Sequence, residues 1–77
     1  MPTVLRIKGY RIGFFSAALG EPPHVHVRKD DNQAKFWLHP VELAKNAGFP
    51  RHELNEIFDL VREHQQELLR AWHEYFG

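Results

Sequence analysis

The chain has 77 residues, enough for one small domain, residues 1–77. It contains no cysteine, which excludes disulfides and thiolate metal sites. Its ten basic and ten acidic residues cancel, but residues 1–38 carry six Lys and Arg against three Asp and Glu, whereas residues 39–77 carry four against seven. The zero total therefore combines a basic half, at +3, with an acidic half, at −3.

The first segments predict a β-hairpin. Thr3–Lys8 and Tyr10–Ser16 are rich in β-branched and aromatic residues and flank the turn Lys8-Gly9. A two-residue turn there predicts these cross-strand pairs: Ile7 with Tyr10, Leu5 with Ile12, Thr3 with Phe14, and Arg6 with Arg11 on the opposite face. Two like charges in one pair are unfavourable unless an anion lies nearby.

A second hairpin is predicted from His24–Lys29 and Gln33–Leu38. Its valines should share a face with the apolar residues of the second strand, because a slip of one residue would turn every side chain to the other face. A turn at Asp31-Asn32 satisfies this condition. It gives the pairs Val27 with Phe36, Val25 with Leu38, His26 with Trp37 and Arg28 with Lys35.

The acidic half predicts helices. Pro40 suits the start of a short helix, Val41–Ala47, and Gly48 suits its end. Pro50 opens a long helix with apolar residues at helical spacing, which runs to about Phe76. Gln65 lies in the middle of its apolar stripe, so it should be hydrogen-bonded or lie at an interface. A helix this long predicts an overhang through which two copies could form a homodimer.

The predicted fold is α+β. A four-stranded, mainly antiparallel sheet of two hairpins (residues 1–38) packs one face on the long C-terminal helix, after a short helix (residues 39–77). The other sheet face can remain open to solvent. On the predicted register that open face collects Arg6, Arg11, His24, His26, Arg28, Lys35 and Trp37, with Phe15 at its edge. Cations with interleaved aromatics are typical of a nucleic-acid surface, but a polar outer face is also ordinary for such sheets.

The pair His24-x-His26 projects from one face of a strand and allows three interpretations. Two histidines could supply half of a zinc site, although the local sequence offers no third ligand. They could act as general acid and base, with Lys35 stabilising a developing phosphate charge, as metal-independent RNA cleavage requires. They could also be two polar residues on a solvated face. His64, at the edge of the helical stripe, is by default a half-buried core histidine, or else a residue that reaches the site.

The residues discussed so far also form a family pattern. The stretches MPTVLRIKGYRIGFFS, EPPHVHV, AKFWLHPVELAKNAGF and LVREHQQELLRAWHEYFG resemble the bacterial domain-of-unknown-function family 4160 over nearly the whole chain. Members are often encoded beside another small protein, and the pair is commonly described as a toxin–antitoxin system. The resemblance supplies no established catalytic residues. It does place these residues on recurring positions of the family: Glu21, Pro22, Pro23, His24, His26, Lys35, Trp37, Pro40 and His64.

These observations favour a toxin-like protein that binds or cleaves RNA through the open face. His24, His26 and Lys35 would be catalytic, Arg6, Arg11, Arg28 and Trp37 would bind RNA, and Glu21 and His64 would support them, with no metal or other cofactor. The resemblance implies a cognate small protein partner encoded nearby. Two alternatives stay open: a non-enzymatic interaction module, such as an antitoxin or complex subunit, and a small His-ligated metal-binding protein. Without a signal-peptide-length apolar run or a membrane span, we expect a cytoplasmic location and no membrane partner.

Overall fold

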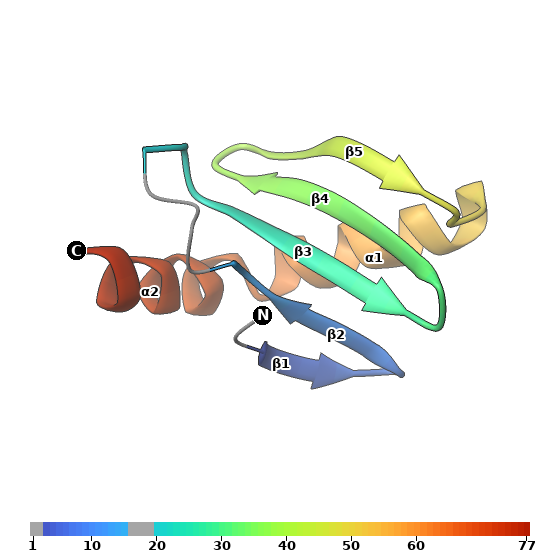
Figure 1. Cartoon of the computed structure of the whole chain (residues 1–77), viewed down its shortest axis with the longest axis horizontal. Helices are drawn as coiled ribbons and strands as arrows, with labels where there is room; N and C mark the ends of the chain where they lie inside the picture. Colours follow the sequence, from blue (N-terminus) through green and yellow to red (C-terminus); the bar gives the residue numbers. More distant parts are fainter. Residues whose placement is uncertain (1–2, 16–19) are drawn as a thin grey trace.

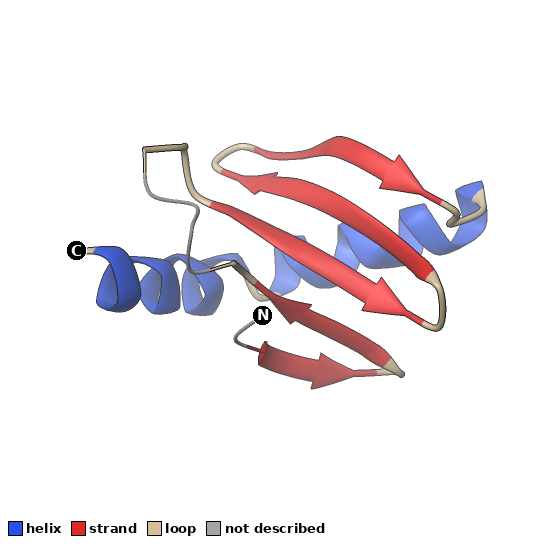
Figure 2. Ribbon diagram, viewed as in Figure 1, coloured by secondary structure: helices blue, strands red, loops and turns tan. Residues whose placement is uncertain are grey.

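The computed structural model describes residues 3–15 and 20–77. It is α+β, as predicted, with one antiparallel sheet and two helices (Figures 1 and 2). The sheet has five strands rather than four, in the spatial order β1-β2-β3-β4-β5, so each strand pairs with the next along the chain. The elements are β1 (Thr3–Ile7), β2 (Tyr10–Gly13), β3 (His24–Lys29), β4 (Asn32–Leu38), β5 (Val41–Ala47), α1 (Arg51–Glu63) and α2 (Gln65–Phe76).

The first hairpin confirms most of the predicted register. Ile7 pairs with Tyr10, Arg6 with Arg11 and Leu5 with Ile12. The turn residues Lys8 and Gly9 both have positive φ, 52° and 83°, which is typical of a tight hairpin turn. An irregularity between Thr3 and Leu5 pairs Thr3 with Gly13, so the predicted pairing with Phe14 was wrong. The end of the predicted strand at Ser16 lies outside the described residues.

The second hairpin has the predicted faces but not the predicted register. The turn is Asp30-Asp31, and the observed pairs are Val25 with Phe36, Val27 with Ala34, His26 with Lys35 and His24 with Trp37. All four predicted pairs were therefore wrong by a shift of two residues: Val27 with Phe36, Val25 with Leu38, His26 with Trp37 and Arg28 with Lys35. Such a shift keeps every side chain on its face, so the alternation of polar and apolar residues could not reveal it. Asp30 occupies the turn with a φ of 54°, a conformation that Asp tolerates better than most residues.

The predicted short helix Val41–Ala47 is strand β5. It pairs antiparallel with β4, from Leu38 opposite Val41 to Gln33 opposite Ala47. The prediction of a helix was based on Pro40 and Gly48 at its two ends, and the Glu, Leu, Ala and Lys residues between them also have a local preference for a helix. The hydrogen-bonding edge of β4 overrides it, because pairing satisfies backbone groups on both strands.

The predicted long helix is two helices with a break at His64. This residue has φ −103° and ψ 14°, and α2 begins at the next residue. Gln65 donates a hydrogen bond from Nε2 to the carbonyl oxygen of Leu38 at 2.7 Å, which satisfies its amide in the middle of the apolar stripe. Figure 1 shows α2 continuing beyond the end of the sheet.

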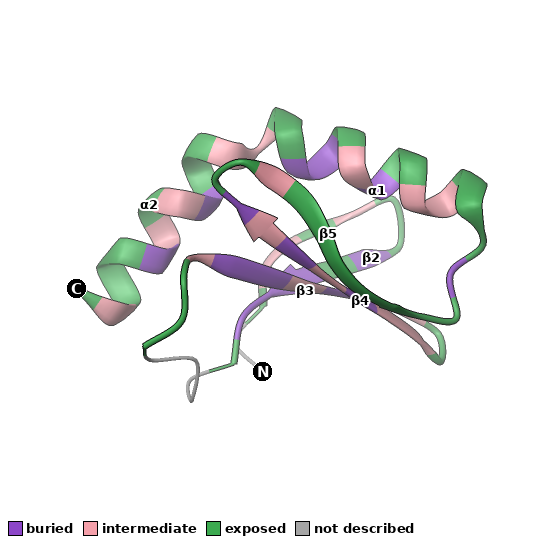
Figure 3. Ribbon diagram, turned by 90° about the horizontal axis from the view of Figure 1, so that it is seen from above, coloured by how far each residue is buried: buried purple, intermediate pink, exposed green. Residues whose placement is uncertain are grey.

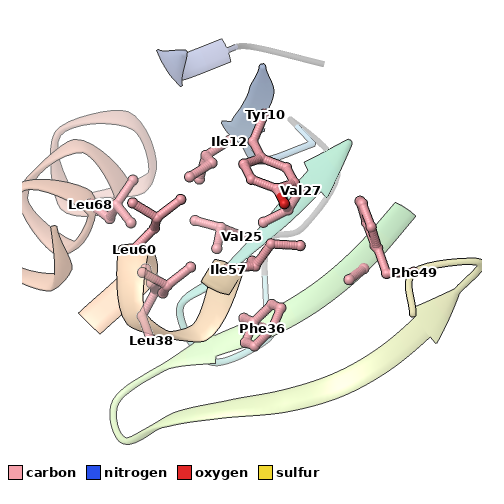
Figure 4. Close-up of a cluster of buried hydrophobic side chains, with 12 residues drawn as sticks. Tyr10, Ile12, Val25, Val27, Phe36, Leu38, Phe49, Ile57, Leu60 and Leu68 are labelled. Carbon is pink, nitrogen blue, oxygen red and sulfur yellow. The ribbon is translucent and has the colours of Figure 1, made fainter. Parts of the chain in front are cut away.

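Both helices cover the same face of the sheet (Figure 3). Apolar side chains from the strands and from α1 and α2 meet between the two layers (Figure 4), and the larger buried cluster consists of Tyr10, Ile12, Val25, Val27, Ala34, Phe36, Leu38, Phe49, Ile57, Leu60, Val61 and Leu68. Phe14 and Trp72 form a second buried cluster. Tyr10 donates its hydroxyl to Glu56 Oε1 at 2.8 Å, and burial together with the neighbouring Glu56 and Glu53 raises the pKa of Tyr10. The helix layer therefore leaves the opposite sheet face as the place for a site.

Candidate nucleic-acid interface

Three arginines lie side by side across the open face. Arg6 of β1 pairs with Arg11 of β2, which in turn pairs with Arg28 of β3. We call Arg6, Arg11 and Arg28 the arginine row. All three are exposed. Side chains of directly paired residues on one face lie within about 5.5 Å of each other at Cβ, so the register places three positive charges next to one another.

The arginine row has no acidic partner within the described residues. The ion pairs there join Lys29 to Glu53, Lys35 to Glu21 and His64 to Glu67. A hollow of about 330 Å³ lies beside the row, lined by Gly9, Arg11, Arg28, Lys29 and Asp30. Uncompensated like charges are unfavourable in a free protein and become favourable when an anion binds between them.

A second basic row crosses β3, β4 and β5. His26 of β3 pairs with Lys35 of β4, which pairs with Lys45 of β5. A hollow of about 370 Å³ lies over these residues, and its lining also includes Gln33. Lys45 was not among the predicted site residues, because residues 41–47 were predicted to be helical. The only signal that could have placed it is the pairing of β5 with β4.

The predicted catalytic residues do come together at one end of this face. We call Glu21, His24, His26, Lys35 and Trp37 the histidine corner. Lys35 Nζ donates to Glu21 Oε1 at 2.8 Å and lies 4.5 Å from the centre of the Trp37 ring. The hydrogen bond from Lys35 lowers the pKa of the Glu21 carboxyl, and the nearby His24 and His26 act in the same direction. Lys35 therefore already has a carboxylate partner, in an ion pair at the surface.

His24 is buried, with only 1% of its surface exposed. Its ring lies 5.0 Å from the Trp72 ring of α2 and 5.7 Å from Trp37. Its Nδ1 is 3.0 Å from the carbonyl oxygen of Pro22. Because a carbonyl only accepts, Nδ1 must carry a proton and donate it. The burial and this fixed hydrogen bond give His24 a packing position at the start of β3, against Trp72 of α2.

His26 is partly buried and held as a neutral ring. Gln33 Nε2 donates to its Nδ1 at 3.3 Å, so the lone pair is on Nδ1 and the proton is on Nε2. The ring of Phe15, which is 38% exposed, packs at 4.4 Å. Burial, followed by the positive influence of His24 and Lys35, lowers the pKa of His26 from 6.5 to about 4. Such a ring is neutral at physiological pH and a weak base. Sequence reasoning missed Gln33, since the two-residue error in register separated it from His26.

His64 lies at the junction of α1 and α2. Its Nδ1 is 3.4 Å from Glu67 Oε1 within the helix layer, and none of its hydrogen bonds or ion pairs in the described residues reaches the histidine corner.

In residues 3–15 and 20–77 no group of three or more His, Cys, Asp or Glu side chains is close enough to hold a metal ion. Neither α1 nor α2 has the length and apolar character needed to cross a bilayer.

Comparison with family models gives one match. The model described as domain of unknown function (DUF4160) matches residues 9–73. The chain belongs to this family. No curated protein matches it, and no solved structure matches it. The DUF4160 match spans β2 to α2, so it includes Arg11 and Arg28 of the arginine row and the entire histidine corner, whereas Arg6 precedes it.

Proposed function

We propose that this DUF4160 protein binds single-stranded RNA on the open face of its sheet. The observation that carries the proposal is the arginine row, where three exposed guanidinium groups lie on adjacent strands and form no ion pair within the described residues. Arginine presents a planar fork of donors that matches phosphate oxygens in a bidentate way. A strand of RNA crossing the sheet would place successive phosphates on this row.

The distribution of charge supports a polyanion as the ligand. The chain is neutral overall, but the acidic residues are concentrated in the part that forms the helix layer. Lys45 of β5, which is exposed and pairs with Lys35, adds a further cation to the same face. A positive face backed by a negative one orients an approaching polyanion toward the sheet.

Aromatic residues and the open sheet favour a single strand over a duplex. Phe15 is exposed beside His26, and Trp37 lies partly exposed beside Lys35. Unpaired bases stack on such side chains, and an open antiparallel sheet with aromatics is a recurring platform for single-stranded RNA. A paired helix would keep its bases out of reach of them.

The geometry supports binding better than cleavage by His24, His26 and Lys35. His24 is buried, His26 has a low pKa, and Lys35 is engaged by Glu21. General acid–base catalysis needs accessible groups whose pKa lies near the working pH. We therefore propose a toxin-like component that acts by occupying RNA, with the corner as structural support for the binding face.

Fluorescence anisotropy of a labelled, mixed-sequence single-stranded RNA tests the proposal. We expect affinity to fall as salt rises, because each phosphate contact releases counterions. Arg11→Ala and Arg28→Ala should each weaken binding by about tenfold and reduce the salt slope by about one. Electrophoresis of the same samples should show intact RNA.

Arg70→Ala is the matched control, since Arg70 is an exposed arginine on α2 in the helix layer. It should bind RNA as the wild type does. Absence of binding at low salt, or an equal loss in Arg70→Ala, would refute the proposal. Cleavage that persists in metal-free buffer and disappears in His26→Ala would restore the catalytic hypothesis.

A further inference from the structure

The outer edge of β5 is an unpaired strand edge. β5 is the last strand of the sheet, and six of its seven residues are exposed. Figure 1 shows no other element of the described chain along this edge. Edge strands offer a row of free backbone donors and acceptors to another strand. The edge therefore needs either protection or a partner.

A β-bulge sets which side chains β5 presents. Lys45 pairs with Lys35, but Leu43 pairs with the next residue, Phe36, so Ala44 is an extra residue in the strand. Without the bulge, residues 42 and 45 would point to opposite faces, since the side-chain period of a strand is two. With it, Glu42 and Lys45 both lie on the open face.

We propose that two copies of this chain form a symmetric dimer through antiparallel pairing of β5 with β5. Pairing about the midpoint between Leu43 and Ala44 places Glu42 opposite the partner's Lys45. The two-fold symmetry places Lys45 opposite the partner's Glu42 in the same way. The bulge allows this, because directly opposed residues must lie on one face to interact. The edge is thus complementary in charge to a copy of itself.

The helix-side surface beside β5 supports the same interface. Leu43 is 46% exposed on that side. It borders a groove of about 470 Å³ between β5 and α1, whose lining includes Phe49, Leu54 and Phe58. In the dimer, the two copies of Leu43 lie near the two-fold axis, where each covers part of the groove. Apolar area at the centre with charge pairs on one flank is the usual composition of a specific interface.

Reversing the charges of Glu42 and Lys45 tests the dimer, with the mass in solution measured by analytical ultracentrifugation. The wild type should reach twice the mass of the 9.1 kDa chain as its concentration rises from micromolar to millimolar. Glu42→Lys and Lys45→Glu should each weaken the dimer by at least about tenfold, because each opposes like charges at two symmetric positions. The double variant Glu42→Lys/Lys45→Glu should recover it.

Mixing the two single variants gives the sharpest result. One variant presents lysine at both positions and the other presents glutamate at both, so an equimolar mixture should form a heterodimer although neither variant dimerises alone. Glu74→Lys, an exposed charge change on α2, is the control and should dimerise normally. Circular dichroism should show that every variant is folded.

Three outcomes would overturn the proposal. The wild type could stay monomeric at millimolar concentration, or the dimer could persist in both single variants. A dimer insensitive to β5 charges but lost in Tyr75→Ser would place the interface on the C-terminal helix, where Tyr75 is 51% exposed. None of these results bears on RNA binding by the arginine row, so the two proposals fail independently.

Discussion

The arginine row and the histidine corner lie on the same sheet face, but their charged and polar groups have different surroundings. In the corner, Lys35 holds Glu21, and both histidine rings have hydrogen-bond partners. In the row, Arg6, Arg11 and Arg28 lie beside one another, and none of them forms an ion pair with an acidic side chain among residues 3–15 and 20–77. Residues of the types used in catalysis can thus have their hydrogen-bonding and charge partners within the protein, whereas a surface can bind a ligand where its charges have no such partner.

The largest expected effect is on the free energy of unfolding, when a residue of the histidine corner is removed. His24→Ala removes a buried ring between Trp37 and Trp72 and should lower the free energy of unfolding by about 3 kcal/mol, because the surrounding side chains close the cavity only in part. Chemical denaturation measures the loss. His52→Ala, on the exposed start of α1, is the control. If His24→Ala is as stable as the wild type, His24 is not the packing residue inferred here.

Charge reversal in the row should have the next largest effect. Arg11→Glu places an acid between Arg6 and Arg28 and should reduce RNA affinity on the order of a hundredfold, through one lost contact and one new repulsion. Lys35→Gln should reduce RNA affinity by less than about threefold, since Glu21 already forms an ion pair with this lysine. Anisotropy titrations compare them. A larger loss in Lys35→Gln would reverse the ranking of the two regions.

Acid should destabilise the fold through His26. Its pKa is lowered from 6.5 to about 4, so the unfolded chain binds more protons than the folded chain between these values. Stability therefore falls as pH decreases from 6.5 toward 4, by at most about 1.4 kcal/mol per pH unit from this residue. His26→Asn keeps an acceptor for Gln33 and should flatten the profile. Thermal melts across this range measure it, and parallel profiles would exclude His26 as the cause.

The smallest expected effect comes from removing the ion-pair partner of Lys35, so that this lysine, like the arginines of the row, is left without one. Glu21→Gln removes the anion from Lys35 and should raise RNA affinity by about threefold, with a salt slope steeper by about 0.7. Stability should change little, since an exposed ion pair contributes under about 1 kcal/mol. Unchanged affinity would mean that RNA does not reach Lys35.

From the sequence, the sheet face of each side chain could be predicted more accurately than its cross-strand partners. The alternation in β1 to β4 predicted which residues point to the helices, and the Lys8-Gly9 turn fixed Arg6 opposite Arg11. The register of β3 against β4 could not be predicted from this alternation, because a shift of two residues keeps every side chain on its face. That shift decides that His26 contacts Gln33 and Lys35, and hence where the histidine corner lies.

The sequence by itself determined the α+β class, the open basic face and membership of the DUF4160 family, because these depend on local alternation, turn residues and motif order. Only the tertiary structure decided that Val41–Ala47 is a strand, since the free edge of β4 outweighs the helix preference of its residues. It also decided that His24 is buried, because Trp72 approaches it from α2, forty-eight positions later in the chain. Burial of this kind depends on the packing of distant elements, which no local pattern encodes.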